Sequence, residues 1–201
     1  SAQTPKQAHV LTDGTKGLFV KEIEEALLRR DVDFAVHSGK DLPGALAEGL
    51  VIAAYPERED PRDAYIGRGG KSWADAGRGQ KIATSSLRRK IQILRAKPGV
   101  DIVPMRGNVD TRLRKLEEGV CDGLVIALAG LRRLGRADVP HEPIGEDLVV
   151  PAPAQGALAV EACADRPEIL ERLRALDCAR TRLEVEFERS FLRAIGGGCS
   201  T

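Results

Sequence analysis

Short apolar runs alternate with stretches of helical periodicity along most of the chain, and this alternation limits the folds it can adopt. Five runs are predicted to be buried strands, at residues 34–36, 50–54, 81–84, 102–104 and 124–127. Four helices are predicted beside them, at residues 20–30, in a segment with Leu87, Ile91 and Leu94 on one face, at residues 109–118, and in a segment bearing Leu131 and Leu134. Such alternation favours an α/β fold with mainly parallel sheets and helices on both faces. Ligands then bind beyond the carboxyl ends of the strands.

Two further segments complete the prediction. Residues 56–80 are rich in proline, glycine and charge, so we expect a connection there that can act as a hinge. Thr181 and Glu184 have the spacing of a capping box, which predicts the start of a helix. That helix is expected to turn its apolar residues inward, namely Leu183, Phe187, Phe191 and Ile195.

The charge balance argues against a nucleic-acid-binding protein. The 201 residues include 31 basic and 30 acidic side chains, for a net charge of +1, and only 7 aromatic residues, so the chain has no overall attraction to phosphate. The sequence has no apolar run long enough to cross a membrane and no secretory signal at its start, so we expect neither membrane contact nor export. Any anion site must come from local clusters of arginine and lysine.

The four cysteines fall into two groups. Cys121, Cys163 and Cys178 are expected to be small buried apolar residues, and the absence of a C-x-x-C pair predicts that no metal is bound. Cys199 follows three consecutive glycines, which cannot pack a core and leave the next side chain accessible. Cys199 is therefore the candidate reactive thiol.

Arginines follow three of the predicted strands at the point where each strand meets its helix. The three junctions contain Thr84, Ser85 and Ser86 with Arg88 and Arg89, then Arg106 with Arg112, and then Arg132 with Arg133. Each junction alone is also explained by capped helices with solvated surface arginines. Together they place arginine on one edge of one sheet, which predicts a cleft for a ligand with several carboxylates or phosphates. We expect these arginines to be exposed, so that replacing Arg89 leaves thermal stability nearly unchanged.

A fourth junction delivers an acid to the same kind of position. The strand ending near His37 runs through Ser38, Gly39 and Lys40 into Asp41. An aspartate solvated in a turn is one explanation. A proton-transfer group that faces the arginine-lined cleft is the other.

Eight segments along almost the whole chain resemble porphobilinogen deaminases. They are residues 16–19, 37–43, 57–64, 84–89, 106–109 with 111–112, 129–131, 155–157 and 197–199, in the family's order and spacing. The resemblance implies two domains like the periplasmic binding proteins around a cleft, with a small third α+β domain. It assigns residues 1–56 and 157–175 to an incomplete first domain, 57–156 to the second, and 176–201 to the truncated start of the third.

The resemblance also implies a reaction and the residues that serve it. Such enzymes are cytoplasmic monomers that join four porphobilinogens into hydroxymethylbilane with loss of ammonia, on a dipyrromethane held through a cysteine thioether, here Cys199. Asp41 matches the catalytic aspartate. The matching cofactor-binding residues are Lys40, Ser38, Thr84, Ser86, Arg88, Arg89, Arg112 and Gln155, and the substrate-binding residues are Arg106, Arg133, Ser85, Phe19 and Lys16.

The chain also departs from the family pattern. Residues 1–15 do not match the family's first strand and helix, and Gly39 stands where a larger residue is usual. A non-catalytic anion-binding module of the periplasmic type is the main alternative, which would leave the three glycines before Cys199 unexplained.

Overall fold

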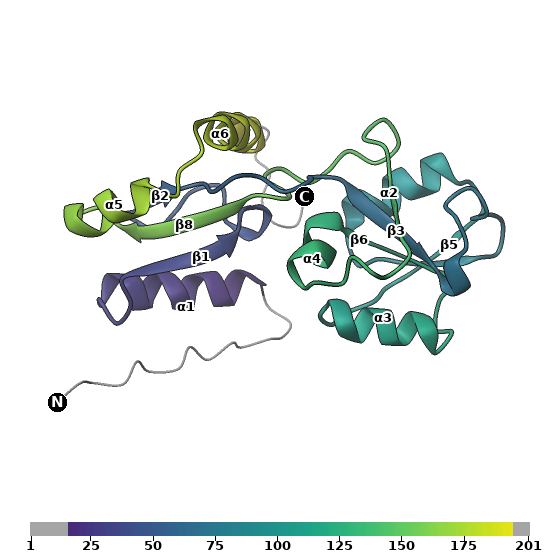
Figure 1. Cartoon of the computed structure of the whole chain (residues 1–201). Coiled ribbons are helices and arrows are strands. Elements are labelled where there is room, and N and C mark those ends of the chain that lie inside the picture. Colours follow the sequence, from purple (N-terminus) through teal and green to yellow (C-terminus); the bar gives the residue numbers. More distant parts are fainter. Residues whose placement is uncertain (1–15, 195–201) are drawn as a thin grey trace.

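The computed structural model describes residues 16–194, with side chains from residue 20 onward, and it contains two lobes joined by two crossing segments (Figure 1). The first lobe comprises residues 16–56 and 157–194, and the second lobe lies between them in sequence. The outgoing crossing covers residues 57–62 and the returning one residues 150–156. The second lobe is therefore inserted into the first.

The sheet of the first lobe has the strand order β1–β8–β2, and both outer strands pair antiparallel to β8. The strands are β1 (Phe34–Ser38), β2 (Leu50–Ala54) and β8 (Leu158–Cys163). Helix α1 (Lys16–Leu28) covers one face, while α5 (Pro167–Arg174) and α6 (Ala179–Ala194) lie on the opposite side (Figure 1). Leu27 of α1 packs with Leu50 and Cys163 of the sheet in one apolar cluster.

The sheet of the second lobe has the order β5–β4–β6–β3–β7. Its strands are β3 (Asp63–Gly67), β4 (Lys81–Ala83), β5 (Asp101–Val103), β6 (Gly123–Ala127) and β7 (Glu142–Pro143). Strand β4 is parallel to β5 and β6, whereas β3 is antiparallel to β6 and β7. Two short 3₁₀ helices, Gly39–Asp41 and Arg68–Gly70, follow β1 and β3.

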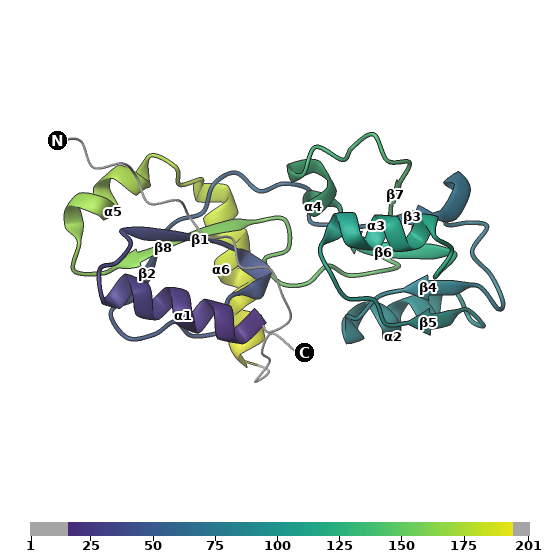
Figure 2. The ribbon, with the colours of Figure 1, turned by 90° about the horizontal axis from the view of Figure 1, so that it is seen from below.

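Helices cover both faces of this second sheet. Alternate residues of β6 point to opposite sides, with Leu124 and Ile126 in one apolar cluster and Val125 in the other. The first cluster includes residues of α3 (Val109–Glu117) and α4 (Leu128–Arg133), and the second includes Ile93 of α2 (Leu87–Ala96). Viewed from below, α1 and α3 cross the same side of their respective sheets (Figure 2).

The predicted α/β class with helices on both faces is confirmed, but two expectations about strands are wrong. The sheets are not mainly parallel, since the pairs within the described first lobe are antiparallel and β3 runs against its neighbours. Residues 56–80 are not only a connection, because they contain β3, whose five residues are all buried. The charged residue at its start, Asp63, hid this strand from the hydrophobic pattern.

The face that α6 turns inward is opposite to expectation, and α2 also exposes its apolar face. In α6, Leu183, Phe187 and Phe191 are exposed, and Val185 and Arg189 face inward instead. Arg189 tolerates burial because its guanidinium donates to the carbonyl of Pro43 at 2.8 Å. In α2, the apolar face formed by Leu87, Ile91 and Leu94 is likewise exposed, and the buried residues are Arg89 and Ile93.

Two smaller expectations fail for local reasons. Helix α6 begins at Ala179, so Thr181 lies inside its first turn rather than at a capping box, and the Thr181 hydroxyl accepts from the Arg58 amide at 3.0 Å. Cys121 and Cys163 are buried as predicted, whereas Cys178 is only half-buried at the start of α6. Within the described residues, no helix has the length and apolar character needed to span a membrane.

Candidate functional site

The three arginine-bearing junctions meet at one edge of the second sheet, as predicted. Parallel pairing aligns Ala83 with Val103 and with Leu124, so the carboxyl ends of β4, β5 and β6 point the same way. Helices α2, α3 and α4 start just beyond these ends. Their first turns therefore border a common region.

Hydroxyl and amide side chains shape the starts of these helices. Ser86 is the N-cap of α2 and accepts from the Arg89 amide at 3.4 Å, and Asn108 caps α3 by accepting from the Thr111 amide at 2.8 Å. Ser85 both donates to the Met105 carbonyl and accepts from the Met105 amide, at 2.9 and 3.0 Å. Thr84 is buried, and its hydroxyl accepts from the Ser86 amide at 3.2 Å.

Arg88 and Arg89 converge on a carboxylate that the sequence interpretation gave no role. Arg88 donates to Asp63 Oδ2 at 2.8 Å, and Arg89 donates to Asp63 Oδ1 at 2.7 Å. The side chain of Asp63 is fully buried and that of Arg89 is 9% exposed. The expectation that Arg89 is exposed is therefore wrong, because its charge is compensated inside the protein.

The electrostatics of this group favour an ionised carboxylate. Burial alone raises the pKa of Asp63, but the charges and hydrogen bonds of Arg89 and Arg88 outweigh it and hold that pKa below its usual value. Burial and the nearby charge of Arg89 both lower the pKa of Arg112, whose Nε donates to the Gly107 carbonyl at 2.7 Å. Positive charge is thus in excess where Arg89 and Arg112 approach each other.

Arg89 also retains an unused donor. Its Nε is buried and has no hydrogen-bond partner among the described residues, although its Nη1 donates to the Val125 carbonyl at 3.4 Å. A buried guanidinium N–H without a partner is unfavourable, and an anionic oxygen is its strongest acceptor. The group therefore fits a ligand carboxylate.

The returning crossing connects the arginines to the first lobe through Gln155, which is fully buried. Its amide nitrogen donates to the Pro61 carbonyl at 2.6 Å and to Asp63 at 2.8 Å, and its oxygen accepts from Arg89 at 3.4 Å. The next residue, Gly156, has φ +84°, and a Cβ there would lie 2.3 Å from the Glu59 carbonyl oxygen. Only glycine allows the two crossings to approach this closely.

Two more arginines border the crossings. Arg133 donates to the Gly156 carbonyl at 2.6 Å, and burial lowers the pKa of Arg133 while the carboxylate of Glu59 opposes that shift. Arg132 pairs with the same Glu59 at 2.6 Å. Arg106 is exposed in the turn between β5 and α3.

Arg58 of the outgoing crossing and Glu188 of α6 form a clamp that also contacts the returning crossing. Arg58 binds both oxygens of Glu188, at 2.8 and 3.0 Å, and donates to the Gln155 carbonyl at 3.0 Å. Neither Asp63 nor this clamp was assigned a role from sequence. Asp63 and Arg58 lie within residues 57–64, which the sequence marks only through its resemblance to the family.

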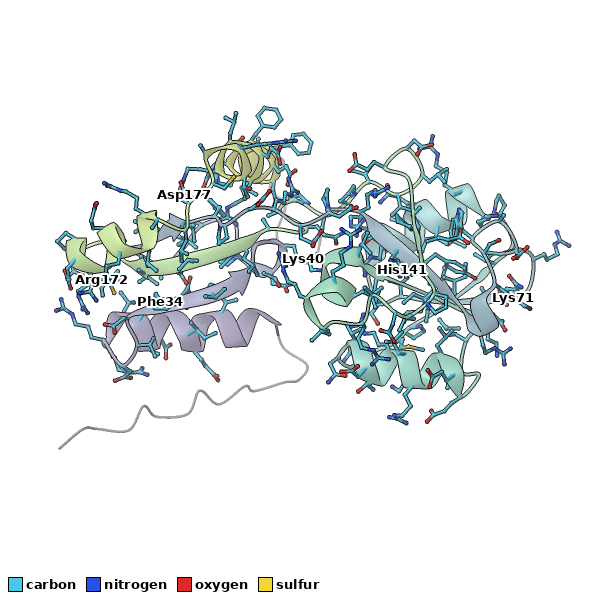
Figure 3. The ribbon with its side chains drawn as sticks, in the orientation of Figure 1. Phe34, Lys40, Lys71, His141, Arg172 and Asp177 are labelled. Carbon is cyan, nitrogen blue, oxygen red and sulfur yellow. The ribbon has the colours of Figure 1, made fainter. Side chains whose placement is uncertain are left out.

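The turn that carries Asp41 lies at the end of β1, on the first lobe. Gly39 is buried, its amide donates to the Ala157 carbonyl at 2.9 Å, and a Cβ there would lie 3.0 Å from Ala154 Cβ. Lys40 and Asp41 are partly exposed and Ser38 is exposed. Figure 3 shows Lys40 on the side of the first lobe that faces the second.

Three predicted site residues cannot be placed in this arrangement. Cys199 lies outside the described residues. Lys16 and Phe19 lie in α1, but the described part includes only their backbone and not their side chains. No group of three or more His, Cys, Asp or Glu suited to a metal occurs among residues that the structure describes.

Comparison with known proteins identifies the family. Residues 4–171 match the sequence model described as "Porphobilinogen deaminase, dipyromethane cofactor binding domain". The chain belongs to the porphobilinogen deaminase family. The porphobilinogen deaminase of Desulforudis audaxviator is 53% identical over 92% of this chain and 60% of its own length, and that of Syntrophus aciditrophicus is 46% identical over 100% and 65%. The chain thus spans less than two thirds of these relatives.

Solved structures agree on the fold. The second substrate-binding domain of a putative amino acid ABC transporter from Streptococcus pneumoniae superimposes with a TM-score of 0.50 at 13% identity, over 88% of this chain and 73% of that one. At this identity the likeness concerns the fold alone. It agrees with the expected arrangement of domains like those of periplasmic binding proteins.

Proposed function

We propose that this chain is the catalytic part of a hydroxymethylbilane synthase. The whole protein would be a transferase that joins four porphobilinogen molecules head to tail into hydroxymethylbilane and releases ammonia, for tetrapyrrole biosynthesis. Family membership supports the proposal. Because the chain spans 60% and 65% of the two relatives described above, the activity is proposed for the full-length protein.

The observation that carries the proposal is the buried arginine group at the edge of the second sheet. Each porphobilinogen has an acetate and a propionate, so the growing product is a polyanion. Arg88 and Arg89 share one buried counter-charge, Asp63, and Arg112 is close enough to feel the charge of Arg89. Arg89 also keeps a donor with no partner among the described residues. Ligand carboxylates would supply the missing negative charge.

The same residues fit a dipyrromethane, which we propose is attached through a thioether to Cys199. When bound, this group supplies the primer to which the first substrate is joined. We assign its carboxylates to Arg88, Arg89 and Arg112, with neutral contacts from Ser38, Thr84, Ser86 and Gln155 and a further charge from Lys40. Substrate carboxylates are assigned to Arg106 and Arg133, with Ser85, Lys16 and Phe19 around them.

Asp41 is proposed as the catalytic carboxylate. Positive charge develops on the substrate as ammonia leaves, and a fixed carboxylate at that point stabilises the transition state more than the ground state. The turn that holds Asp41 is fixed by the bond from Gly39 to Ala157, two residues beyond Gln155. Asp41 and the arginines are thus tied to the same crossing.

We further propose that residues 1–56 and 157–175 belong to the first domain, 57–156 to the second, and 176–201 to the start of the third. A cytoplasmic monomer is expected from the family, with porphobilinogen as its small-molecule ligand.

Intact mass of the full-length protein tests the proposal directly. The parent should carry a covalent dipyrromethane, and Cys199→Ser should carry none and should not turn over. A Cys199→Ser protein that still holds a denaturation-resistant dipyrromethane would exclude this attachment. A parent that binds anions but carries no pyrrole would instead be a non-catalytic anion-binding module.

A further inference from the structure

Asp63 is a buried carboxylate for which the proposed function names no role beyond counter-charge. It is the first residue of β3, and its side chain is fully buried. Three donors reach its two oxygens, from Arg88 at 2.8 Å, Arg89 at 2.7 Å and Gln155 at 2.8 Å. Each carboxylate oxygen is therefore engaged.

These donors come from separate parts of the chain. Arg88 and Arg89 lie in the first turn of α2, while Gln155 lies on the returning crossing. Both arginines have further bonds to main-chain carbonyls, from Arg88 to Val150 and from Arg89 to Val125. The carboxylate thus connects the start of α2 to β3 and to the segment that enters the first lobe.

The arginines need this anchor for electrostatic reasons. A positive side chain in the first turn of a helix is opposed by the helix dipole, and two adjacent guanidinium groups repel each other. Without a buried negative charge, both long side chains would gain hydration and rotamer freedom by turning to solvent. Asp63 offsets that tendency and still leaves Arg89 Nε without a partner among the described residues.

We propose that Asp63 is a positioning residue that holds Arg88 and Arg89 in the orientation in which they receive ligand carboxylates. It acts through the arginines and does not touch the ligand. This role rests on the proposed function, since it presumes that the two arginines bind pyrrole carboxylates. Its loss should weaken cofactor loading and substrate binding, in addition to any effect on stability.

Asp63→Asn in the full-length protein tests the role. The amide keeps the shape and one acceptor oxygen, but it removes the charge and turns an N–H group toward an arginine or glutamine donor. We expect the fraction carrying dipyrromethane by intact mass to fall about tenfold. In the loaded fraction, the KM for porphobilinogen should rise about tenfold, which corresponds to about 1.4 kcal/mol of binding.

Asp177→Asn is the matched control. Asp177 also pairs with an arginine, Arg182, at 2.8 Å and accepts from the Tyr55 amide at 2.8 Å, but it lies in the first lobe, before α6. It should lose stability while its loading and KM stay within about twofold of the parent. If Asp63→Asn kept the parent's loading and KM, or changed them only as much as Asp177→Asn, Asp63 would be merely structural.

A second variant covers the case in which Asp63→Asn does not fold. The exchange Asp63→Asn with Gln155→Glu keeps one buried negative charge beside Arg89 but withdraws it from Arg88. We expect this variant to fold with a KM above that of Gln155→Glu alone, and a KM equal to that of Gln155→Glu alone would overturn the proposal. A parent that carries no dipyrromethane would refute the proposed function instead, so the two failures are distinct.

Discussion

Replacing Gly156 by alanine tests the close approach of the two crossings. Gly156 has φ +84°, and an added Cβ would lie 2.3 Å from the Glu59 carbonyl oxygen and 3.2 Å from that of Asp60. The left-handed backbone alone costs a non-glycine residue about 1–2 kcal/mol. Forcing a methyl group against a fixed carbonyl adds about 1–3 kcal/mol, because main chain on both sides must shift.

Gly70→Ala isolates the second contribution. Gly70 has a similar φ of +76°, but nothing lies within 4 Å of its added Cβ, so only the backbone cost applies. We therefore expect Gly156→Ala to be less stable than Gly70→Ala by about 1–3 kcal/mol. Urea denaturation of the two full-length variants, followed by circular dichroism, measures the difference. Equal unfolding midpoints would refute the steric argument.

Four other outcomes follow from the site and the cysteines. Asp41→Asn should lower the single-turnover rate about a hundredfold, roughly 3 kcal/mol, and Asp41→Glu should retain more activity; equal rates would exclude a catalytic role. Arg89→Leu should reduce the free energy of unfolding by about 3–5 kcal/mol, and an unchanged melting temperature would contradict the buried pair. Ionised Asp63 contributes to the free energy of unfolding above its unfolded-state pKa of about 3.9, and this contribution is lost as pH falls through its lower folded-state pKa. Asp63→Asn should therefore be less stable than the parent at pH 7 and nearly as stable in strong acid. A loss of stability that does not change with pH would refute this linkage. Hydrogen bonds to Thr181 lower the pKa of Cys178, whereas burial raises that of Cys121, so brief alkylation at pH 7 should modify Cys178 before Cys121. The reverse order on peptide mapping would contradict these environments.

Periodicity predicted the elements that are apolar on the buried side. Strands β4 and β6 and helix α3 lie where their patterns placed them. The shared edge of the three junctions also followed from the sequence, because parallel strands that precede helices must end on one side of the sheet.

Prediction failed where polar residues are buried or apolar residues are exposed. Asp63, Arg89 and Arg189 occupy inward positions because partners distant in sequence satisfy them, and no local pattern encodes those partners. The apolar stripe of α6 looked like core for the converse reason. Asp63 also concealed β3, so one misjudged residue hid both a strand and the anchor of the arginines.

The interrupted order of the first sheet has a consequence for synthesis on the ribosome. Among the described strands of this sheet, the middle one, β8, is synthesised last, and β1 and β2 pair with β8 rather than with each other. The inserted lobe, by contrast, is complete in sequence before β8 emerges. During synthesis the second lobe should therefore fold before the first. Its folding should bring the two parts of the first lobe, which precede and follow it in sequence, close together. Released chains that end just before residue 158 should protect β3–β6 from proteolysis and leave β1 and β2 susceptible.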